Sequence, residues 1–525
     1  MKLVLSSSNQ AALQGVVADL VSERIASRIA SKDDSMWGAA AQPEASIRLG
    51  WITSASDSQA LLPAIFALRD EFAAGGITRF VLCGMGGSSL APEVITKNAG
   101  VDLVVLDSTA PDQVAAALIH LEKTAVVVSS KSGSTVETDS QKRAFETAFK
   151  AAGINPTERI VIVTDPGSPL DAASREAGYR VFNADPNVGG RYSALTAFGL
   201  VPTGLAGVDI SQLLASAVAA SPALGSDSQD NPALLLGALL ARSENGVGFK
   251  DKFLIECDGL AGFGDWVEQL VAESTGKEDK GTLPVVVDSN APEISTLPSD
   301  TLLIRFSSEV SGNTDAAFHG SLGELFLLWE YATVIAGYLQ GINPFDQPNV
   351  ESAKVAARAL LDSPASNAEV DFVDRGVAIK SYGFDIQGST LDAAVEELLA
   401  LVDDSSYISI HAYLNRMAYP QLESLRELMA KRSGRPVTFG WAPRFLHSTG
   451  QYHKGGPKQG VFLQLTGEFE SDLAIEGRPF SFGSLIQAQA AGDANVLKNN
   501  GLPVLTLKLG NVLADLDKLK QVIAS

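Results

Sequence analysis

Between residues 79 and 182 the chain alternates short apolar runs with longer stretches of helical periodicity. The apolar runs lie at 79–83, 101–106, 124–129, 159–164 and 179–182, and the helical stretches between them include 111–122 and 136–151. Strands that alternate with helices at this spacing form a mainly parallel sheet with helices on both faces. The pattern therefore predicts a doubly wound α/β domain over residues 52–230.

A second and less regular alternation follows a Ser- and Ala-rich boundary at 221–230. Its apolar runs lie at 253–256, 283–287, 302–306, 407–410, 437–441, 461–465 and 504–507, and longer helical patterns interrupt it at 322–340 and 391–401. We expect a second α/β domain of the same type, with insertions, over residues 231–525. Before the first domain, apolar residues at helical spacing predict an N-terminal helical segment over residues 1–51.

The charge balance excludes some classes of partner. Asp and Glu number 61 against 40 Lys and Arg, so the net charge is −21. Such a surface repels nucleic acid and anionic lipid, and any phosphate site must supply its own positive potential. The two cysteines, Cys83 and Cys257, form no disulfide framework, which favours a reducing, cytoplasmic location. No run approaches the roughly 18 apolar residues of a membrane span.

A glycine-rich loop, G-M-G-G-S-S-L at 84–90, directly follows the first apolar run and opens a helix. Glycines at such a place let backbone N–H groups approach an anion, and the helix N-terminus adds positive potential. The loop lacks the third glycine of a dinucleotide fingerprint, which argues against a nucleotide-binding dehydrogenase. A plain tight turn is the alternative to an anion site.

A hydroxyl-rich loop, S-S-K-S-G-S-T-V-E-T at 129–138, also lies between an apolar run and a helix. Its hydroxyls and backbone donors can take phosphate oxygens, and Lys131 can lend charge. The alternative is simple helix capping by Thr135 or Ser134, but a cap needs one such residue. Both loops follow carboxyl ends of strands, where ligands bind in open α/β sheets. The sequence predicts a phosphate cup here.

Two further patterns carry polar groups that can act on a substrate. In Gly189-Gly190-Arg191 a glycine turn can bring the rigid guanidinium group of Arg191 close to a substrate. The alternative is an ordinary surface arginine on a loop. Gln269 and Glu273 lie four residues apart, hence on one face of a helix that Gly276 ends. A carboxylate at the unfavourable end of the helix dipole suits a general base, although most such glutamates are ordinary surface residues.

The motifs occur in the order G-x-G-G-S, S-K-S-G-S-T-x-E-T, G-G-R-x-S, Q-x-x-x-E-S-x-G-K and, at 345–354, F-D-Q-P-x-V-E-x-x-K. Together they resemble the glucose-6-phosphate isomerase family, whose members are pairs of sugar-isomerase (SIS) domains. The resemblance runs from about residue 49 to beyond residue 354. The stretch 446–457 makes it closest to the isomerase part of fused transaldolase/glucose-6-phosphate isomerase proteins. It implies a homodimer that acts on a sugar phosphate without a cofactor.

The resemblance assigns site residues motif by motif. Those that bind the sugar phosphate are Gly87, Ser88, Ser130, Lys131, Ser132, Thr135 and Gln269. Arg191 matches the arginine that steadies the enediolate, and Glu273 matches the base that moves a proton between C1 and C2. Lys354 matches the lysine near the ring oxygen and O5.

The ring-opening histidine departs from the family order, in which it lies between the glutamate and the lysine. His319 is the only histidine in that interval, and it lacks the expected neighbours. His447 matches the family pattern H-[S/A]-x-x-Q but follows Lys354. We therefore predict a rearranged order of segments in the second domain, with His447 as the ring-opening group.

The implied reaction is the interconversion of glucose 6-phosphate and fructose 6-phosphate. An isomerase that also accepts mannose 6-phosphate is an alternative, and so is a non-catalytic SIS module that senses sugar phosphates. A sensor needs the phosphate cup but no proton-transfer groups, so the presence of Glu273 and His447 favours the enzyme. The five histidines contain no H-x-H or H-E-x-x-H pattern, and we expect no metal.

Overall fold

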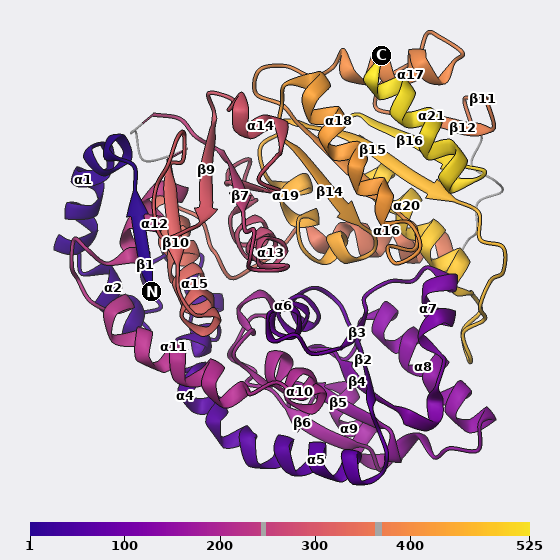
Figure 1. Cartoon of the computed structure of the whole chain (residues 1–525), viewed down its shortest axis with the longest axis horizontal. Coiled ribbons are helices and arrows are strands. Elements are labelled where there is room, and N and C mark those ends of the chain that lie inside the picture. The colour runs from indigo at the N-terminus through magenta and orange to yellow at the C-terminus, as the bar shows by residue number, and fades with distance from the viewer. Residues whose placement is uncertain (243–247, 363–369) are drawn as a thin grey trace.

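The computed structural model describes residues 1–242, 248–362 and 370–525, and only the backbone at 351–354 and 362. Over these residues the chain forms three sheets, each covered by helices. Figure 1 shows the first sheet at the bottom in purple, the second at the upper left and the third at the upper right in orange and yellow. The predicted α/β class, with mainly parallel sheets, is confirmed.

The first sheet is parallel throughout, in the order β3-β2-β4-β5-β6. Its strands are β2 (Arg79–Gly84), β3 (Val104–Leu106), β4 (Thr124–Ser129), β5 (Ile160–Thr164) and β6 (Arg180–Asn183). Alternate side chains of β2 point to opposite faces, so Leu82 packs in one core and Val81 in another. The Leu82 face is covered by α5 (Leu62–Ala74), α6 (Leu90–Ala99) and α10 (Ala197–Ala206), and the Val81 face by α7 (Pro111–Ala117), α8 (Val136–Ala151) and α9 (Pro169–Glu176).

The second sheet has the order β1-β10-β9-β7-β8 and is parallel except for β1. Its strands are β1 (Lys2–Leu5), β7 (Lys252–Glu256), β8 (Leu283–Val287), β9 (Thr301–Phe306) and β10 (Ala316–His319). The helices of this region are α1 (Ser7–Ser22), α2 (Ile25–Ala30), α3 (Gln42–Ala45), α4 (Ser54–Asp57), α11 (Ile210–Leu224), α12 (Pro232–Leu240), α13 (Phe263–Thr275), α14 (Pro292–Ser295) and α15 (Leu322–Gln340). Helix α16 (Val350–Asp362) follows α15 in the chain and packs on α20 (Phe482–Asn499) of the third region. Buried α12, α13 and α15 cover one face of the sheet.

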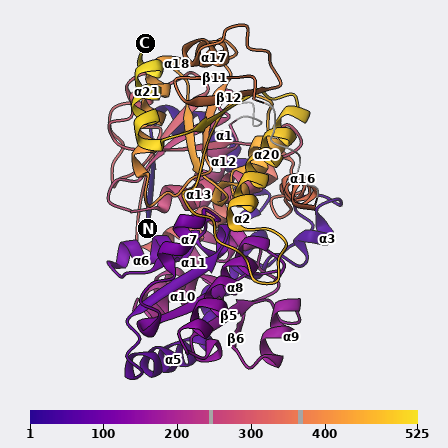
Figure 2. The same ribbon diagram turned by 90° about the vertical axis from the view of Figure 1, so that its right-hand side faces the viewer.

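The third sheet has the order β11-β12-β16-β15-β13-β14. Its strands are β11 (Phe372–Asp374), β12 (Val377–Tyr382), β13 (Tyr407–Ala412), β14 (Val437–Trp441), β15 (Gly460–Gly467) and β16 (Val504–Leu509), and its helices are α17 (Leu391–Leu399), α18 (Ser424–Ser433), α19 (Gly450–Gly455), α20 (Phe482–Asn499) and α21 (Val512–Ala524). Tyr407 and Phe462 pack with Leu254 and Leu303 of the second sheet in one core. Figure 2 shows the third sheet above the first, at the C-terminal end of the chain.

Two features differ from the sequence-based expectation. The N-terminal segment is helical after residue 6 but begins with β1, which pairs antiparallel with β10. The insertions expected within 231–525 amount to a complete six-stranded sheet, because the runs from 407 onward pair with one another rather than with β7. The short edge strand β11 and the polar β12 carry too little apolar periodicity to be found from the sequence. The domain boundaries themselves stay predictions.

Helix α15 is long and apolar enough to cross a membrane, contrary to the expectation that no stretch approaches that length. However, 78% of the relevant stretch is buried inside the protein, where α15 packs against α11, α12 and α13. A core helix of this kind passes the same test of length and composition, so the helix is weak grounds for a membrane span.

The close packing of α12 on α15 depends on Gly237. A Cβ atom there would lie 2.5 Å from Ile335 Cγ2 and 3.0 Å from the Ala332 carbonyl oxygen. Gly237→Ala should therefore lower the free energy of unfolding by about 1–3 kcal/mol, the usual cost of overpacking. Gly15→Ala is the matched control: this helical position of α1 has no atom within 4 Å of the added Cβ. It should raise stability by about 0.5–1 kcal/mol. Denaturant unfolding of both variants measures the difference, and equal effects would contradict the packing argument.

Candidate functional site

The first glycine loop lets separate segments of the chain meet. Gly86 has a φ of +55°, and a Cβ there would lie 2.6 Å from the His447 carbonyl oxygen and 2.9 Å from Gln269 Nε2. A Cβ on Gly87 would lie 2.0 Å from the carbonyl oxygen of Gly190. Only glycine fits at these positions, so the loop is more than a tight turn: it brings three of the predicted motifs into contact. Ser88 is buried beside Gly87.

The hydroxyl-rich loop lines a cavity of about 360 Å³. Ser132, Ser134 and Thr135 form part of its wall, whereas Ser130 is buried behind them and donates to Thr135 Oγ1 at 3.2 Å. Thr135 is the N-cap residue of α8 but its side chain makes no capping hydrogen bond. The capping alternative therefore does not account for these hydroxyls, which are available to a ligand in the cavity.

Lys131 does not face this cavity. Its Nζ lies 2.5 Å from Asp165 Oδ2 and donates to the Pro186 carbonyl oxygen at 3.3 Å. Burial lowers the pKa of Lys131, while Asp165 opposes that shift. The cations that do line the cavity are Arg358 of α16 and Arg478, and no sequence motif pointed to either. Arg478 is also paired with Asp139 at 2.5 Å.

Glu273 is held on α13 between two of the predicted partners. Gln269 Nε2 donates to Glu273 Oε2 at 3.1 Å and also to the His447 carbonyl oxygen at 2.9 Å. On the other side, Arg191 Nη1 lies 3.2 Å from Glu273 Oε1, and the two side chains are 2% and 12% exposed. Neither is an ordinary surface residue. The structure thus brings the predicted base, the arginine and the glutamine together.

Arg191 is fixed by bonds from every nitrogen of its guanidinium group. Nε donates to Ser274 Oγ at 2.8 Å, Nη1 to Gln347 Oε1 at 2.9 Å and Nη2 to the Pro344 carbonyl oxygen at 2.7 Å. Because these donors are already bound, Arg191 acts on a neighbouring group as a fixed positive charge. Gln347 belongs to the F-D-Q-P motif, within which the sequence indicated no role for this glutamine.

The same loop is held by Lys277, which donates to the carbonyl oxygens of Asn343 and Asp346 at 2.6 Å each. Burial lowers the pKa of Lys277 to about 8. Lys354 follows on α16, but its side chain lies outside the described residues, so its predicted position near the ring oxygen stays a prediction.

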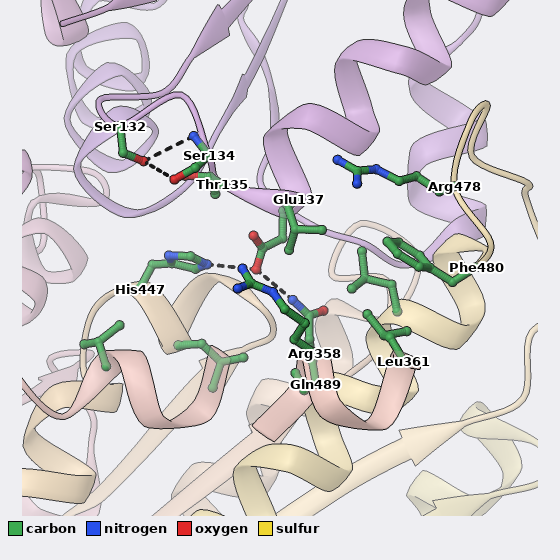
Figure 3. A pocket seen from close by; sticks show the side chains of 15 residues that line it. Ser132, Ser134, Thr135, Glu137, Arg358, Leu361, His447, Arg478, Phe480 and Gln489 are labelled. Carbon is green, nitrogen blue, oxygen red and sulfur yellow. Dashed lines mark hydrogen bonds and ion pairs between the residues drawn. The ribbon is translucent and has the colours of Figure 1, made fainter. Parts of the chain in front are cut away.

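His447 lies in a short 3-10 turn, Arg444–His447, after β14. Its Nε2 is 2.9 Å from Glu137 Oε1, and its ring lines the cavity. Figure 3 shows His447 and Gln489 approaching Glu137 from opposite sides. The turn is anchored by Arg444, whose Nη2 lies 2.5 Å from Glu93 Oε2 of α6. His447 therefore belongs to the same site as the hydroxyl-rich loop.

Sequence reasoning missed the role of Glu137, although it stands two residues after Thr135 inside a quoted motif. Its place in the first turn of a helix, next to the predicted phosphate site, could have drawn attention to it. Gln489, in α20, carried no signal at all.

His319 lies elsewhere. It ends β10, pairs with Lys2 of β1, is exposed and stacks on Phe306 with ring centroids 5.3 Å apart. Among the described contacts, none joins it to Glu273, Arg191 or the hydroxyl-rich loop. The geometry favours His447.

His411 of β13 is buried, and its Nε2 is hydrogen-bonded to Ser409 Oγ at 2.9 Å. Its neighbour His453 is buried too, and desolvation holds its pKa well below the usual value. Over the described part of the chain, no group of three or more His, Cys, Asp and Glu residues could hold a metal ion.

Comparisons with known proteins place this site in a family. The family model described as phosphoglucose isomerase matches residues 69–295. The probable glucose-6-phosphate isomerase of Haloarcula marismortui is 28% identical over 60% of this chain and 84% of its own length. The glucose-6-phosphate isomerase of Citrifermentans bemidjiense is 30% identical over 59% of this chain and 72% of its own length.

A crystal structure of a glucose-6-phosphate isomerase from Chlamydia trachomatis shares the fold. Its TM-score is 0.52 at 21% identity, over 67% of this chain and 86% of that chain. The matched family segment contains the glycine loop, the hydroxyl-rich loop, Arg191 and Glu273. Arg191 and Glu273 do not themselves line the cavity of the hydroxyl-rich loop; Gln269 links Glu273 to His447, whose ring does. The chain belongs to the phosphoglucose isomerase family.

Proposed function

We propose that this protein interconverts glucose 6-phosphate and fructose 6-phosphate through ring opening and a cis-enediolate. One observation carries the proposal. The Glu273 carboxylate is held between Gln269 and Arg191, and Gln269 is bound in turn to the backbone of His447, which lines the hydroxyl-rich cavity. A base and a fixed cation are thus linked through Gln269 to a second proton carrier, and the ring of that carrier lines a cavity suited to a phosphate. The curated relatives described above are named for this reaction.

The phosphate group of the substrate binds away from the reacting carbons and anchors the substrate. Ser132 and Thr135 offer hydroxyl donors at the cavity wall, and Arg358 adds positive charge there. Energy from binding the phosphate positions carbons C1 and C2 at the reacting groups.

Ring opening moves a proton from the anomeric hydroxyl to the ring oxygen. His447 suits this step because imidazole gives and takes protons near neutral pH without help. Its Nε2 is turned to Glu137, so Nδ1 is the nitrogen left for the sugar.

Isomerisation of the open aldose begins when Glu273 takes the proton from C2. The electron pair of the C2–H bond forms the C1=C2 double bond, and the C1 carbonyl oxygen becomes the enediolate oxygen. Glu273 returns its proton to C1 while the proton of the C2 hydroxyl moves to the C1 oxygen, so the carbonyl is now at C2 and the product is the ketose. Arg191 opposes the developing negative charge, and such preorganised charge is worth most in a water-poor site.

Glu273→Gln should lose nearly all turnover while sugar-phosphate affinity changes little, because the amide keeps the shape but cannot take a proton. Loss of a positioned general base costs about 10²–10⁴-fold in rate. The measurement is kcat in a coupled assay with fructose 6-phosphate, beside substrate binding by calorimetry. Glu278→Gln, at an exposed position close in sequence, is the control and should match the wild type. Retention of more than about a tenth of kcat by Glu273→Gln would remove Glu273 as the base.

Ser132→Ala and Thr135→Ala should each raise KM for fructose 6-phosphate, and inorganic phosphate should compete with substrate. A hydrogen bond to a charged group is worth about 1.5–3 kcal/mol, which corresponds to roughly 10–150-fold in binding. The exposed Ser7→Ala is the control and should leave KM unchanged. If both variants keep the wild-type KM and phosphate does not compete, the phosphate binds elsewhere.

His447→Ala should be slow on the cyclic sugar but much less impaired in C1–C2 proton exchange of substrate that is already open. The reason is that only ring opening needs the imidazole. His319→Ala is the matched control, because His319 is exposed on β10 and should behave like the wild type in both assays. The reverse pattern, with His319→Ala defective on cyclic sugar and His447→Ala normal, contradicts the assignment.

A further inference from the structure

A buried hydrogen-bond chain leads from the first sheet to His447 through a glutamine that belongs to none of the sequence motifs. Gln489 of α20 is 4% exposed. Its Nε2 donates to Glu137 Oε1 at 2.7 Å, and its Oε1 accepts from Thr109 Oγ1 at 2.8 Å. Glu137 Oε1 is also the atom that lies 2.9 Å from His447 Nε2.

Thr109 decides which end of the Gln489 amide faces Glu137. Thr109 is fully buried, and its hydroxyl donates to Gln489 Oε1. A flipped amide would place its oxygen against the carboxylate oxygen, and both are acceptors. The observed orientation is therefore the one that satisfies all three groups, and Nε2 of Gln489 is held on Glu137.

The Gln489 donor and the position of Glu137 on its helix favour the ionised form of the carboxylate. Glu137 lies in the first turn of α8, where the helix dipole favours negative charge, and hydrogen bonds to the charged form favour it further. An ionised carboxylate only accepts, so His447 must donate from Nε2. That leaves Nδ1 of the neutral ring as the acceptor, which is the tautomer that the proposed ring opening requires.

We propose that Gln489 is a positioning residue for His447: it holds the Glu137 carboxylate in the one orientation that keeps His447 in the Nε2–H tautomer. The expected effect on turnover rests on the proposed function. The expected effect on the His447 tautomer does not. Gln489 also lines the cavity, but its amide nitrogen is bound to Glu137, through which it acts on His447. Partners that orient a functional histidine in this way typically matter by about 10–100-fold.

The test compares Gln489→Met, which keeps the length of the side chain but loses its donor, with Gln464→Met. Gln464 is also a fully buried glutamine of the third sheet, and its Nε2 donates to the Ala490 carbonyl oxygen and to Asp493 instead. The control therefore matches the stability cost of losing a buried amide. Thr109→Val, which removes the hydroxyl at the far end of the chain, is the second variant.

The primary measurement is the tautomer of His447 by nitrogen-15 NMR of histidine-labelled protein, with the signal assigned from a His447→Gln sample. We expect Nε2–H in the wild type and in Gln464→Met, and a mixture of tautomers in Gln489→Met. Turnover of cyclic fructose 6-phosphate should fall about 10–100-fold in Gln489→Met, with C1–C2 exchange of open substrate preserved. Thr109→Val should show a smaller change in the same direction.

An unchanged tautomer in both Gln489→Met and Thr109→Val overturns the proposal, as does an equal loss of turnover in Gln464→Met. If the wild type has no isomerase activity, the proposed function fails. The NMR comparison still decides whether Gln489 sets the tautomer.

Discussion

The buried guanidinium group of Arg191 holds the site together. It comes from the loop after the first sheet, yet its partners Ser274 and Glu273 lie on α13 and Pro344 and Gln347 lie before α16. The Arg191 side chain is only 2% exposed, and a charged group so deeply buried is tolerated only when partners surround it. Removing one partner leaves a buried group unpaired, which lowers stability strongly. The planar fork with donors in three directions is a property of arginine, so lysine could not replace these bonds.

Charged pairs attach the third sheet to the rest of the protein in a similar way. Arg444 and Arg416 of the third region both reach Glu93 of α6, at 2.5 and 3.1 Å. A further pair joins Arg426 of α18 to Glu293 of α14 at 2.6 Å. The Arg444–Glu93 pair fixes the turn that carries His447 against α6, and the His447 carbonyl oxygen accepts from Gln269 of α13 within the same chain. The predicted homodimer is therefore not needed to bring His447 to Gln269.

The sequence predicted those parts of the molecule that local pattern controls. Regular apolar runs marked every strand of the first sheet, and glycine and hydroxyl spacing marked the loops around Arg191 and Glu273. The extra sheet within 231–525 was not separated, because strand runs do not reveal which strands pair. Lys131 was expected to lend charge to the cup, but Asp165, 34 residues away, takes its ammonium group. Gln489 and Arg358 could not be predicted, since they reach the site only through the packing of α20 and α16.

The contact between Glu137 and His447 joins residues 310 positions apart, and this has a consequence for the order of events on the ribosome. At about 5–20 residues per second, roughly 15–60 s pass between synthesis of the carboxylate and arrival of its histidine. The last strand of the first sheet, β6, ends at Asn183, so synthesis completes this sheet and its hydroxyl-rich loop early in that interval, while the histidine is still missing. The hydroxyl wall of the cavity is thus made before its cations, Arg358 and Arg478, and before His447.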